Sequence, residues 1–284
     1  MLLSRAGMML FIALVLLTAA AYLPAQAQRA NAPRELTFKT YLPFITNTTC
    51  ADFAGVTYNA LAPNPPPTDR PAEQHADLNL ALRGYALTNN TLGLIDLDGP
   101  TDTLAPQLYK LFGNQRVPVF SSVYRVYDWN WATNSRGALI TDPPVTLAGM
   151  ETTTDETLYV PASGYNIGTK PARPAEGFFK DAPNDDPNAY EVLVLYASPD
   201  RITLKYTRED NVVNGYTIHV EKICVAPALL ALYQQKNAAG RAQLPALKAG
   251  QPFARARANE IGVVIRDTGQ FMDPRSRKDW WAGK

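Results

Sequence analysis

Short apolar runs separated by turn residues dominate the second half of the chain. The runs are rich in β-branched and aromatic residues, and Gly, Pro, Asn or Asp separate them, which predicts β-strands. The predicted strands lie at 117–131, 190–197, 201–207 and 215–223, with two more and a closing hairpin at 248–274. Thr268 and Gly269 predict the tight turn of that hairpin. We therefore expect a mainly β fold with a few short helices.

Three stretches have helical character. In 72–85 and in 102–112 the apolar residues fall on one helical face, and a glycine lies near the end of each stretch. Residues 227–240 have a proline near the start and a glycine at the end, which is the usual asymmetry of helix termini. These three stretches are the predicted helices.

Composition and charge limit the possible partners. The chain has 284 residues, of which 46% are hydrophobic, so it is long enough to bury a core. Its 27 basic and 26 acidic residues nearly cancel, which gives no electrostatic reason to expect a nucleic acid or an anionic membrane as partner. The sequence has no glycine-rich phosphate loop, no serine-hydrolase elbow and no Cys-x-x-Cys, and we expect no cofactor.

The N-terminus predicts export. Arg5 precedes an apolar stretch at 8–23, which is short for a membrane-spanning helix, and small residues follow at 25–27. This pattern is typical of a secretory signal peptide, 1–27, cleaved after Ala27. An uncleaved membrane anchor is the alternative. We expect a secreted, extracytoplasmic protein with no integral membrane span after cleavage.

The chain has two cysteines, Cys50 and Cys224. In an oxidising compartment such a pair usually forms a disulfide. On chain-entropy grounds a bond that closes so long a loop contributes about 4–5 kcal/mol. A catalytic thiol is the alternative, although nothing beside either cysteine would activate it.

Aromatic residues supply one candidate binding surface. Trp129 and Trp131 are two positions apart on a predicted strand and so share a face. Paired indoles form a stacking surface for a sugar ring, but they are equally common core anchors. The C-terminal 275–281, which mixes basic and aromatic residues, is expected to pack back on the domain, with contact to an anionic wall polymer as the alternative.

Charged residues supply a second candidate surface. The residues concerned are Arg208, Asp210, His219, Glu221, Arg266 and Asp267. They either line a polar cleft or form a solvated sheet face with ordinary ion pairs, and the second interpretation is preferred. His75 and Asp77 are interpreted as a pair on a helix surface.

Four segments resemble, in order, motifs of the lysostaphin-type zinc endopeptidases. The segments are "ETLYVPASGYNI" (156–167), "GYTIHVEKICV" (215–225), "LKAGQPFARA" (247–256) and "EIGVVIRDTGQFMDP" (260–274). The resemblance implies the family's duplicated hybrid β-fold, a β-sandwich or half-barrel, over 145–284, with a loop insertion at 171–189 and a helix insertion at 227–240. Outside it lie an extended leader, 28–49, and an α+β region, 50–144, expected to wrap the core.

The family's zinc ligands are missing from the matching positions. The His-x-x-x-Asp pair falls on Val145 and Gly149, and the second histidine of His-x-His falls on Gly262. Valine and glycine have no donor atoms, and the whole chain has just two histidines, His75 and His219. We therefore expect no metal site and no catalytic residue of the family's kind.

The sequence favours a secreted, non-catalytic protein. We expect it to bind a cell-envelope glycan such as peptidoglycan, or a partner protein. The alternative is an extracytoplasmic hydrolase that uses carboxylates such as Asp128, Glu221, Asp267 and Asp273. A third possibility is a structural domain of a larger surface assembly.

Overall fold

The protein was analysed as a computed structural model that describes residues 50–65, 67–113, 116–164 and 190–284. These residues belong to one unit, Asn47–Lys284. The predicted signal peptide 1–27, the leader 28–49 and the inserted loop 171–189 lie outside the described residues and stay predictions.

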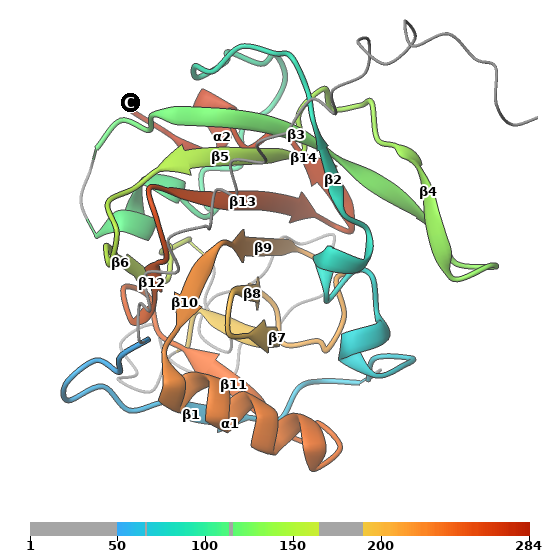
Figure 1. Ribbon diagram of the computed structural model, residues 1–284, viewed down its shortest axis with the longest axis vertical. Coiled ribbons are helices and arrows are strands. Elements are labelled where there is room, and N and C mark those ends of the chain that lie inside the picture. The colour runs from blue at the N-terminus through green and yellow to red at the C-terminus, as the bar shows by residue number, and fades with distance from the viewer. Residues whose placement is uncertain (1–49, 66, 114–115, 165–189) are drawn as a thin grey trace, which may run out of the picture. The chain divides into compact units, whose positions relative to one another are not determined.

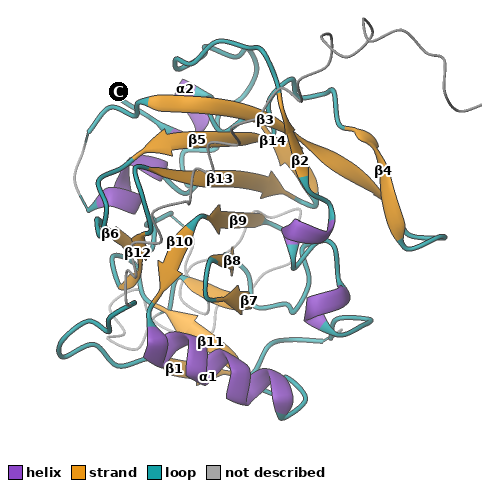
Figure 2. Cartoon of the chain, in the orientation of Figure 1, coloured by secondary structure: helices purple, strands orange, loops and turns teal. Residues whose placement is uncertain are grey.

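One large antiparallel sheet organises the molecule, so the prediction of a mainly β fold with few short helices is confirmed (Figures 1 and 2). Along the sheet the order is β1 (Asn59–Leu61), β11 (Leu244–Leu247), β7 (Val192–Ser198), β8 (Arg201–Lys205), β9 (Tyr216–Glu221), β13 (Glu260–Asp267), β5 (Leu147–Glu151), β3 (Phe120–Asn130) and β2 (Tyr85–Leu87). Two further strands branch from this path: β4 (Ser135–Leu139) pairs with β3, and β14 (Gln270–Met272) pairs with β13. Strands from 50–144 thus pair into the same sheet as strands from 145–284.

A second, three-stranded sheet packs beside the first. It consists of β10 (Ile223–Val225), β12 (Pro252–Ala256) and β6 (Thr157–Tyr159). Cys224 lies in β10, and its disulfide with Cys50, whose Cα atoms are 5.4 Å apart, is present as predicted. The bond joins the beginning of the described chain to this sheet.

Only one of the three predicted helices is a full α-helix. It is α1 (Pro227–Ala238), which buries Leu229 and Tyr233 beside β7 and β11. A short helix, α2 (Arg277–Trp280), follows near the C-terminus.

The predictions of helices over 72–85 and 102–112 are wrong. Both contain only 3-10 turns, at Ala72–Gln74, Leu80–Leu82 and Leu108–Phe112. In the first, the amide of Asp77 donates to Nδ1 of His75 (3.1 Å) instead of to a backbone carbonyl one turn earlier. In the second, Pro106 lacks the amide hydrogen that a continuous helix needs.

The closing hairpin forms as predicted. β13 and β14 pair with Asp267 opposite Gln270. Thr268 and Gly269 connect them with φ values of 50° and 79°, the left-handed conformations of a tight hairpin turn. This turn is the part of the hairpin that reaches the candidate site.

The main core lies on one side of the sheet and includes the three-stranded sheet, and apolar side chains such as Ile218, Val220 and Phe253 are fully buried in it. A smaller apolar cluster on the other side consists of Leu80, Val126, Leu147, Val264 and Phe271. Trp280 and Trp281 are also buried, so the C-terminal segment packs back on the domain as predicted. None of the helices in the described part of the chain has the length and apolar character needed to cross a bilayer.

Candidate functional site

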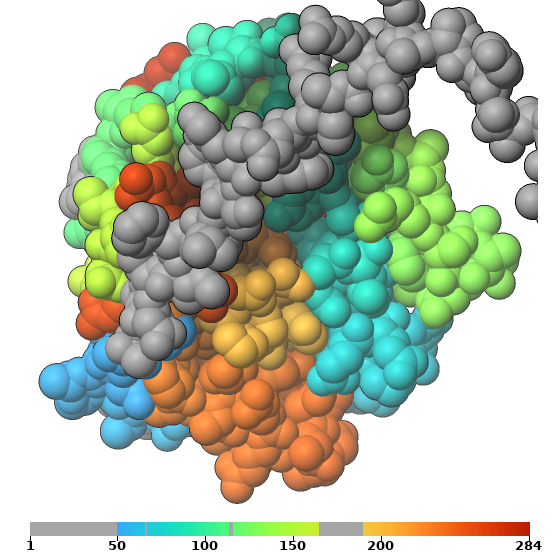
Figure 3. All heavy atoms as spheres, viewed as in Figure 1, coloured from blue at the N-terminus to red at the C-terminus, as the bar shows by residue number. Residues whose placement is uncertain are grey.

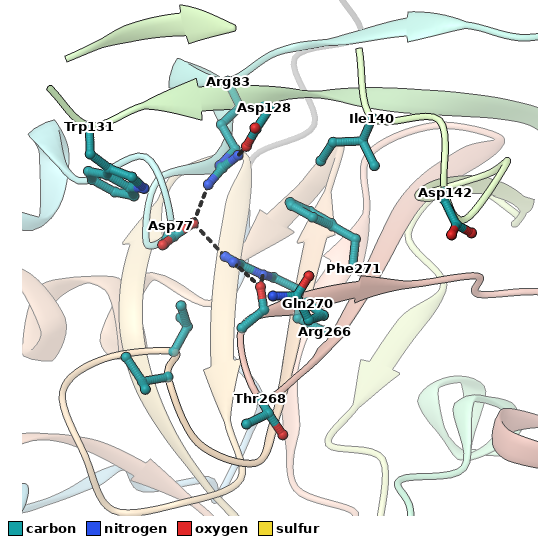
Figure 4. A pocket seen from close by; sticks show the side chains of 13 residues that line it. Asp77, Arg83, Asp128, Trp131, Ile140, Asp142, Arg266, Thr268, Gln270 and Phe271 are labelled. Atoms are coloured by element: carbon teal, nitrogen blue, oxygen red, sulfur yellow. Dashed lines mark hydrogen bonds and ion pairs between the residues drawn. The ribbon is translucent and has the colours of Figure 1, made fainter. Parts of the chain in front are cut away.

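A pocket of about 420 Å³ lies where four segments of the chain meet, and we name it the Asp77 pocket. The segments are 72–85, the β3–β4 hairpin, the loop after β8, and the β13–β14 hairpin. The lining residues are Asp77, Arg83, Asp128, Trp131, Ile140, Asp142, Val212, Val213, Arg266, Thr268, Gly269, Gln270 and Phe271 (Figure 4).

A carboxylate bound by two arginines forms the back of the Asp77 pocket. Oδ1 of Asp77 accepts from Arg83 at 2.6 Å and from Arg266 at 2.7 Å (Figure 4). Burial alone would raise the pKa of Asp77, but the two guanidinium groups outweigh it and lower that pKa below its usual range. Asp77 is therefore ionised at neutral pH, and the two arginines hold its carboxylate in place.

The arginines are themselves held in place. Arg83 donates to the carbonyls of Ala76 (3.2 Å) and Tyr127 (3.2 Å), and Arg266 donates to the carbonyl of Gly269 (3.0 Å). Their guanidinium groups lie 5.4 Å and 4.6 Å from the centre of the Phe271 ring. Because the hydrogen bonds and ring contacts fix both side chains, the geometry around Asp77 is preorganised.

Trp131 forms one wall of the Asp77 pocket. It follows β3 at the hairpin turn and is 40% exposed. Its ring contacts Trp129 (centroids 6.4 Å apart), His75 (5.1 Å) and the guanidinium of Arg70 (4.9 Å). Arg70 also donates to the side chain of Asn134 (3.0 Å), which ties the preceding loop to the hairpin. The indole is thus held in position while part of it faces solvent.

The segment around Asp77 lies against the β3–β4 hairpin at one side of the molecule, cyan beside green in Figure 3. Asp128 lies on the rim of the pocket with its side chain 68% exposed. Its Oδ1 accepts from the amide of Trp129 (2.8 Å) and, at 3.3 Å, from Arg83. The exposed Val213 supplies an apolar part of the rim.

Two of the binding residues predicted from the sequence line the pocket, and a third contacts one of them. Asp128, named for the hydrolase alternative, also lines it. Trp131 and Arg266 are lining residues. Trp129 packs against Trp131, and its Nε1 is buried without a hydrogen-bond partner in the described ranges. The aromatic pair therefore has one half-buried and one exposed member.

His219 lies behind the pocket. It is fully buried, and its Nδ1 is 3.0 Å from Oγ1 of Thr203, which donates to the carbonyl of Leu78 (2.7 Å). Since the hydroxyl uses its hydrogen on that carbonyl, Nδ1 of His219 is the protonated nitrogen. Burial, with a smaller contribution from Arg266, lowers the pKa of His219 to about 3, so the ring is neutral.

The prediction of a solvated sheet face is wrong. His219, Glu221 and Arg266 are buried on the side of β8, β9 and β13 that 72–85 covers. Asp210 is buried elsewhere, in an ion pair with Arg241. Four of the six charged residues also have separate partners in different parts of the structure, so the six do not form one polar cleft. Their partners are Ala62 O for Arg208, Arg241 for Asp210 (2.6 Å), Arg201 for Glu221 (3.0 Å) and Thr268 for Asp267 (2.9 Å).

Sequence reasoning missed most of the pocket. Asp77 was assigned to a helix surface, and that assignment is wrong, since the residue is largely buried between arginines. Arg83 and Phe271 gave no local signal. Asp77 and Arg266 are 189 positions apart, and nothing in the spacing brings them together. The one available signal was the exposed-strand pattern around Trp131.

At the positions that the resemblance matches to zinc ligands, the carboxylate of Glu260 fills the space beside a glycine. Gly149 and Gly262 lie directly opposite each other on β5 and β13. The carboxylate of Glu260 crosses Gly149 and accepts from Ser122 (2.6 Å) and from Lys222. A Cβ atom on Gly149 would lie 2.6 Å from Oε2 of Glu260, so the glycine is what admits this carboxylate.

In the described part of the chain, no three or more His, Cys, Asp or Glu side chains are arranged to hold a metal ion. Val145, at the third matched position, is fully buried and has no donor atom.

Comparison of the chain with protein-family models, with characterised proteins and with solved structures finds no match.

Proposed function

We propose that the chain is an extracytoplasmic, non-catalytic binding protein whose Asp77 pocket receives a sugar unit of a cell-envelope glycan such as peptidoglycan. The observation that carries the proposal is the exposed indole of Trp131 beside the fixed carboxylate of Asp77. An indole offers a flat apolar surface to the C–H face of a pyranose ring. A carboxylate held beside it accepts hydrogen bonds from the ring hydroxyls. This combination of one aromatic wall and a few placed polar groups is typical of small-ligand pockets.

Three further features support the location and the absence of catalysis. The Cys50–Cys224 disulfide fits an oxidising compartment, as does the signal peptide predicted at 1–27. At two of the positions that the resemblance matches to zinc ligands, Gly149 and Gly262, in register on adjacent strands, supply no donor atoms. An aspartate held ionised by two arginines is poorly suited to donate a proton.

The test is binding of the purified protein, without 1–27, to insoluble peptidoglycan and to soluble glycan fragments. We expect retention on the wall material, and we expect Trp131→Ala to weaken binding about tenfold or more because stacking is lost. Leu87→Ala is the matched control, since Leu87 is 71% exposed and lies outside the pocket. Absence of binding by the wild type, or equal binding by the Trp131 variant, would overturn the proposal.

A second candidate function, hydrolysis with a carboxylate as general acid, rests on Glu221. Its burial, opposed by the ion pair with Arg201, raises its pKa to about 7, which is the range that a general acid requires. The other carboxylates named from the sequence do not join it: Asp273 is paired with Arg275, and Asp128 lies on the rim of the Asp77 pocket. Release of soluble wall fragments that depends on Glu221, tested with Glu221→Gln, would favour this alternative.

A further inference from the structure

The charged groups of the Asp77 pocket differ in what they present to a ligand. Three aspartates and two arginines line the pocket. The side chains of Arg83 and Arg266 are each 4% exposed, whereas that of Asp77 is 14% exposed and that of Asp128 is 68% exposed. The positive groups therefore lie behind the pocket and the negative groups face it.

The hydrogen-bonding groups of the pocket divide in the same way: the donors are already used, and several acceptors are free. Both arginines use most of their N–H groups on Asp77 and on backbone carbonyls. The second oxygen of Asp77, the second oxygen of Asp128 and the whole carboxylate of Asp142 have no partner among the described residues. A ligand that donates hydrogen bonds is therefore matched, and one that brings further acceptors is not.

The net field at the mouth of the pocket is also negative. Asp142 is exposed, and among the described residues Asp128 has one ion pair, to Arg83 at 3.3 Å. Arg70, beside Trp131, is an additional cation near the pocket, and its charge is offset by two hydrogen bonds to Asp69. Arg136 is another, and its guanidinium lies over the ring of Tyr127. A positive group on the ligand would be attracted both by these carboxylates and by the face of the indole.

We propose that the sugar unit taken by the Asp77 pocket carries a protonated primary amine, as in a de-N-acetylated amino sugar. The inference rests on the proposed function and specifies its ligand. The pyranose ring packs against Trp131, and the ammonium group lies beside Asp128 with its hydrogens directed at the free oxygen of that carboxylate. Asp142, beyond Ile140 and Phe271 in the same pocket, adds a second negative charge (Figure 4). An N-acetyl group in that place has no charge and only one N–H donor, and a uronic acid meets two carboxylates of its own sign.

Calorimetric titration with three oligosaccharides of equal length tests the proposal: a glucosamine hexamer, an N-acetylglucosamine hexamer and a galacturonic acid hexamer, at pH 6 in low salt. The glucosamine hexamer should bind about tenfold more tightly than the N-acetylated one, and the galacturonic acid hexamer should bind weakest. The advantage of the amine should shrink in 1 M salt, because rim charges are screened.

A double substitution on the rim measures how much the negative charges contribute to the preference for the amine. Asp128→Asn with Asp142→Asn keeps the shape of the pocket and removes two negative charges, so the preference for the glucosamine hexamer should fall to near unity. Asp98→Asn is the control, because Asp98 is an exposed aspartate outside the pocket. Both positions on the rim are solvent-exposed, so the double variant should fold.

The outcomes separate the two proposals. If no hexamer and no wall glycan binds, the proposed function fails. If the N-acetylated or galacturonic acid hexamer binds as tightly as the amine, or if the double variant keeps the preference, the inference about the amine fails while glycan binding stands.

Discussion

Two regions of this protein are built from the same residue types and differ in what those residues leave open. The C-terminal anchor, which we define as Asp273, Arg275, Trp280 and Trp281, combines a carboxylate–guanidinium pair with two indoles. The Asp77 pocket combines Asp77, its two arginines and the indoles of Trp129 and Trp131. Composition alone would assign both regions the same role.

The anchor is closed and its polar groups are satisfied. The side chains of Asp273 and Arg275 are each 1% exposed and bind each other through two oxygens and two nitrogens. The Nε1 atoms of Trp280 and Trp281 donate to the carbonyls of Asp273 (2.9 Å) and Pro274 (2.8 Å). Such a region stabilises the fold and has nothing left to offer a ligand.

In the pocket, by contrast, an indole is exposed, carboxylate oxygens are open, and Nε1 of Trp129 has no partner in the part of the chain that is described. Unsatisfied groups on a rigid frame, rather than residue type, therefore distinguish the proposed binding site from the C-terminal anchor. Substitutions in the two regions should therefore separate stability from binding.

The largest effect is expected for the buried indole. Trp281→Ala should lower the free energy of unfolding by about 3–5 kcal/mol, because it empties a fully buried site beside Phe120. Trp131→Ala should cost less than about 1 kcal/mol, because the ring is already partly in solvent. Urea unfolding of both variants measures the contrast, and similar losses would remove the basis for treating the regions differently.

Next in size are the two carboxylates. Asp273→Ala should cost about 3–5 kcal/mol, because it leaves Arg275 buried and unpaired. Asp77→Ala should cost about 1–3 kcal/mol, since its site is partly open to water. It should also abolish glycan binding, which Asp273→Ala at a temperature well below its unfolding transition should preserve.

Acid titration checks Asp77 independently. Its pKa is lowered in the folded state, so its stabilising contribution is present above its unfolded value, about 4, and is lost as the pH falls through the folded pKa. In Asp77→Asn that acid-dependent part of the unfolding free energy should be missing.

A third carboxylate, that of Glu221, tests whether burial or ion pairing determines its charge in the folded protein. The pKa of Glu221 is raised from 4.5 to about 7, so the folded state holds a proton that the unfolded chain has released. The contribution of Glu221 to stability should be greatest below pH 4.5 and should fall by about 2–3 kcal/mol as the pH rises to 7. Glu221→Gln should lack this component, and a profile unchanged by the substitution would show that Arg201 holds the carboxylate ionised.

The smallest expected effect on stability is that of the rim. Asp128→Asn should change the free energy of unfolding by less than about 0.5 kcal/mol, because the side chain is 68% exposed. A loss of unfolding free energy as large as that of Asp273→Ala would show that Asp128 stabilises the fold and is not merely an exposed residue at the pocket mouth.

Local pattern predicted several parts of the molecule well. The apolar runs that became β7, β8, β9 and β13 were recognised from period and turn residues, and so was α1 from its proline and glycine termini. The disulfide followed from there being only two cysteines in a chain with a predicted export signal. The strands and α1 depend on interactions between residues close in the sequence. For the disulfide, each cysteine had just one possible partner in the chain.

The predicted helix over 72–85 failed because its side chains bind elsewhere. His75 accepts the amide of Asp77, and Asp77 and Arg83 are directed at Arg266 and at the β3–β4 hairpin. These contacts cover the polar side of the sheet, which is also why His219 and Glu221 are buried rather than solvated. A local propensity of a few tenths of a kcal/mol per residue does not compete with several charged hydrogen bonds.

Residue type and near neighbours were enough to predict the β-rich class, the turn at Thr268 and Gly269 and the cysteine pair. They also show that Val145, Gly149 and Gly262 have no side-chain donor atoms. Tertiary structure alone decided which side of the sheet is covered, which tryptophan remains exposed and which arginines hold Asp77. Those outcomes depend on contacts between residues as many as 189 positions apart, which no local periodicity encodes.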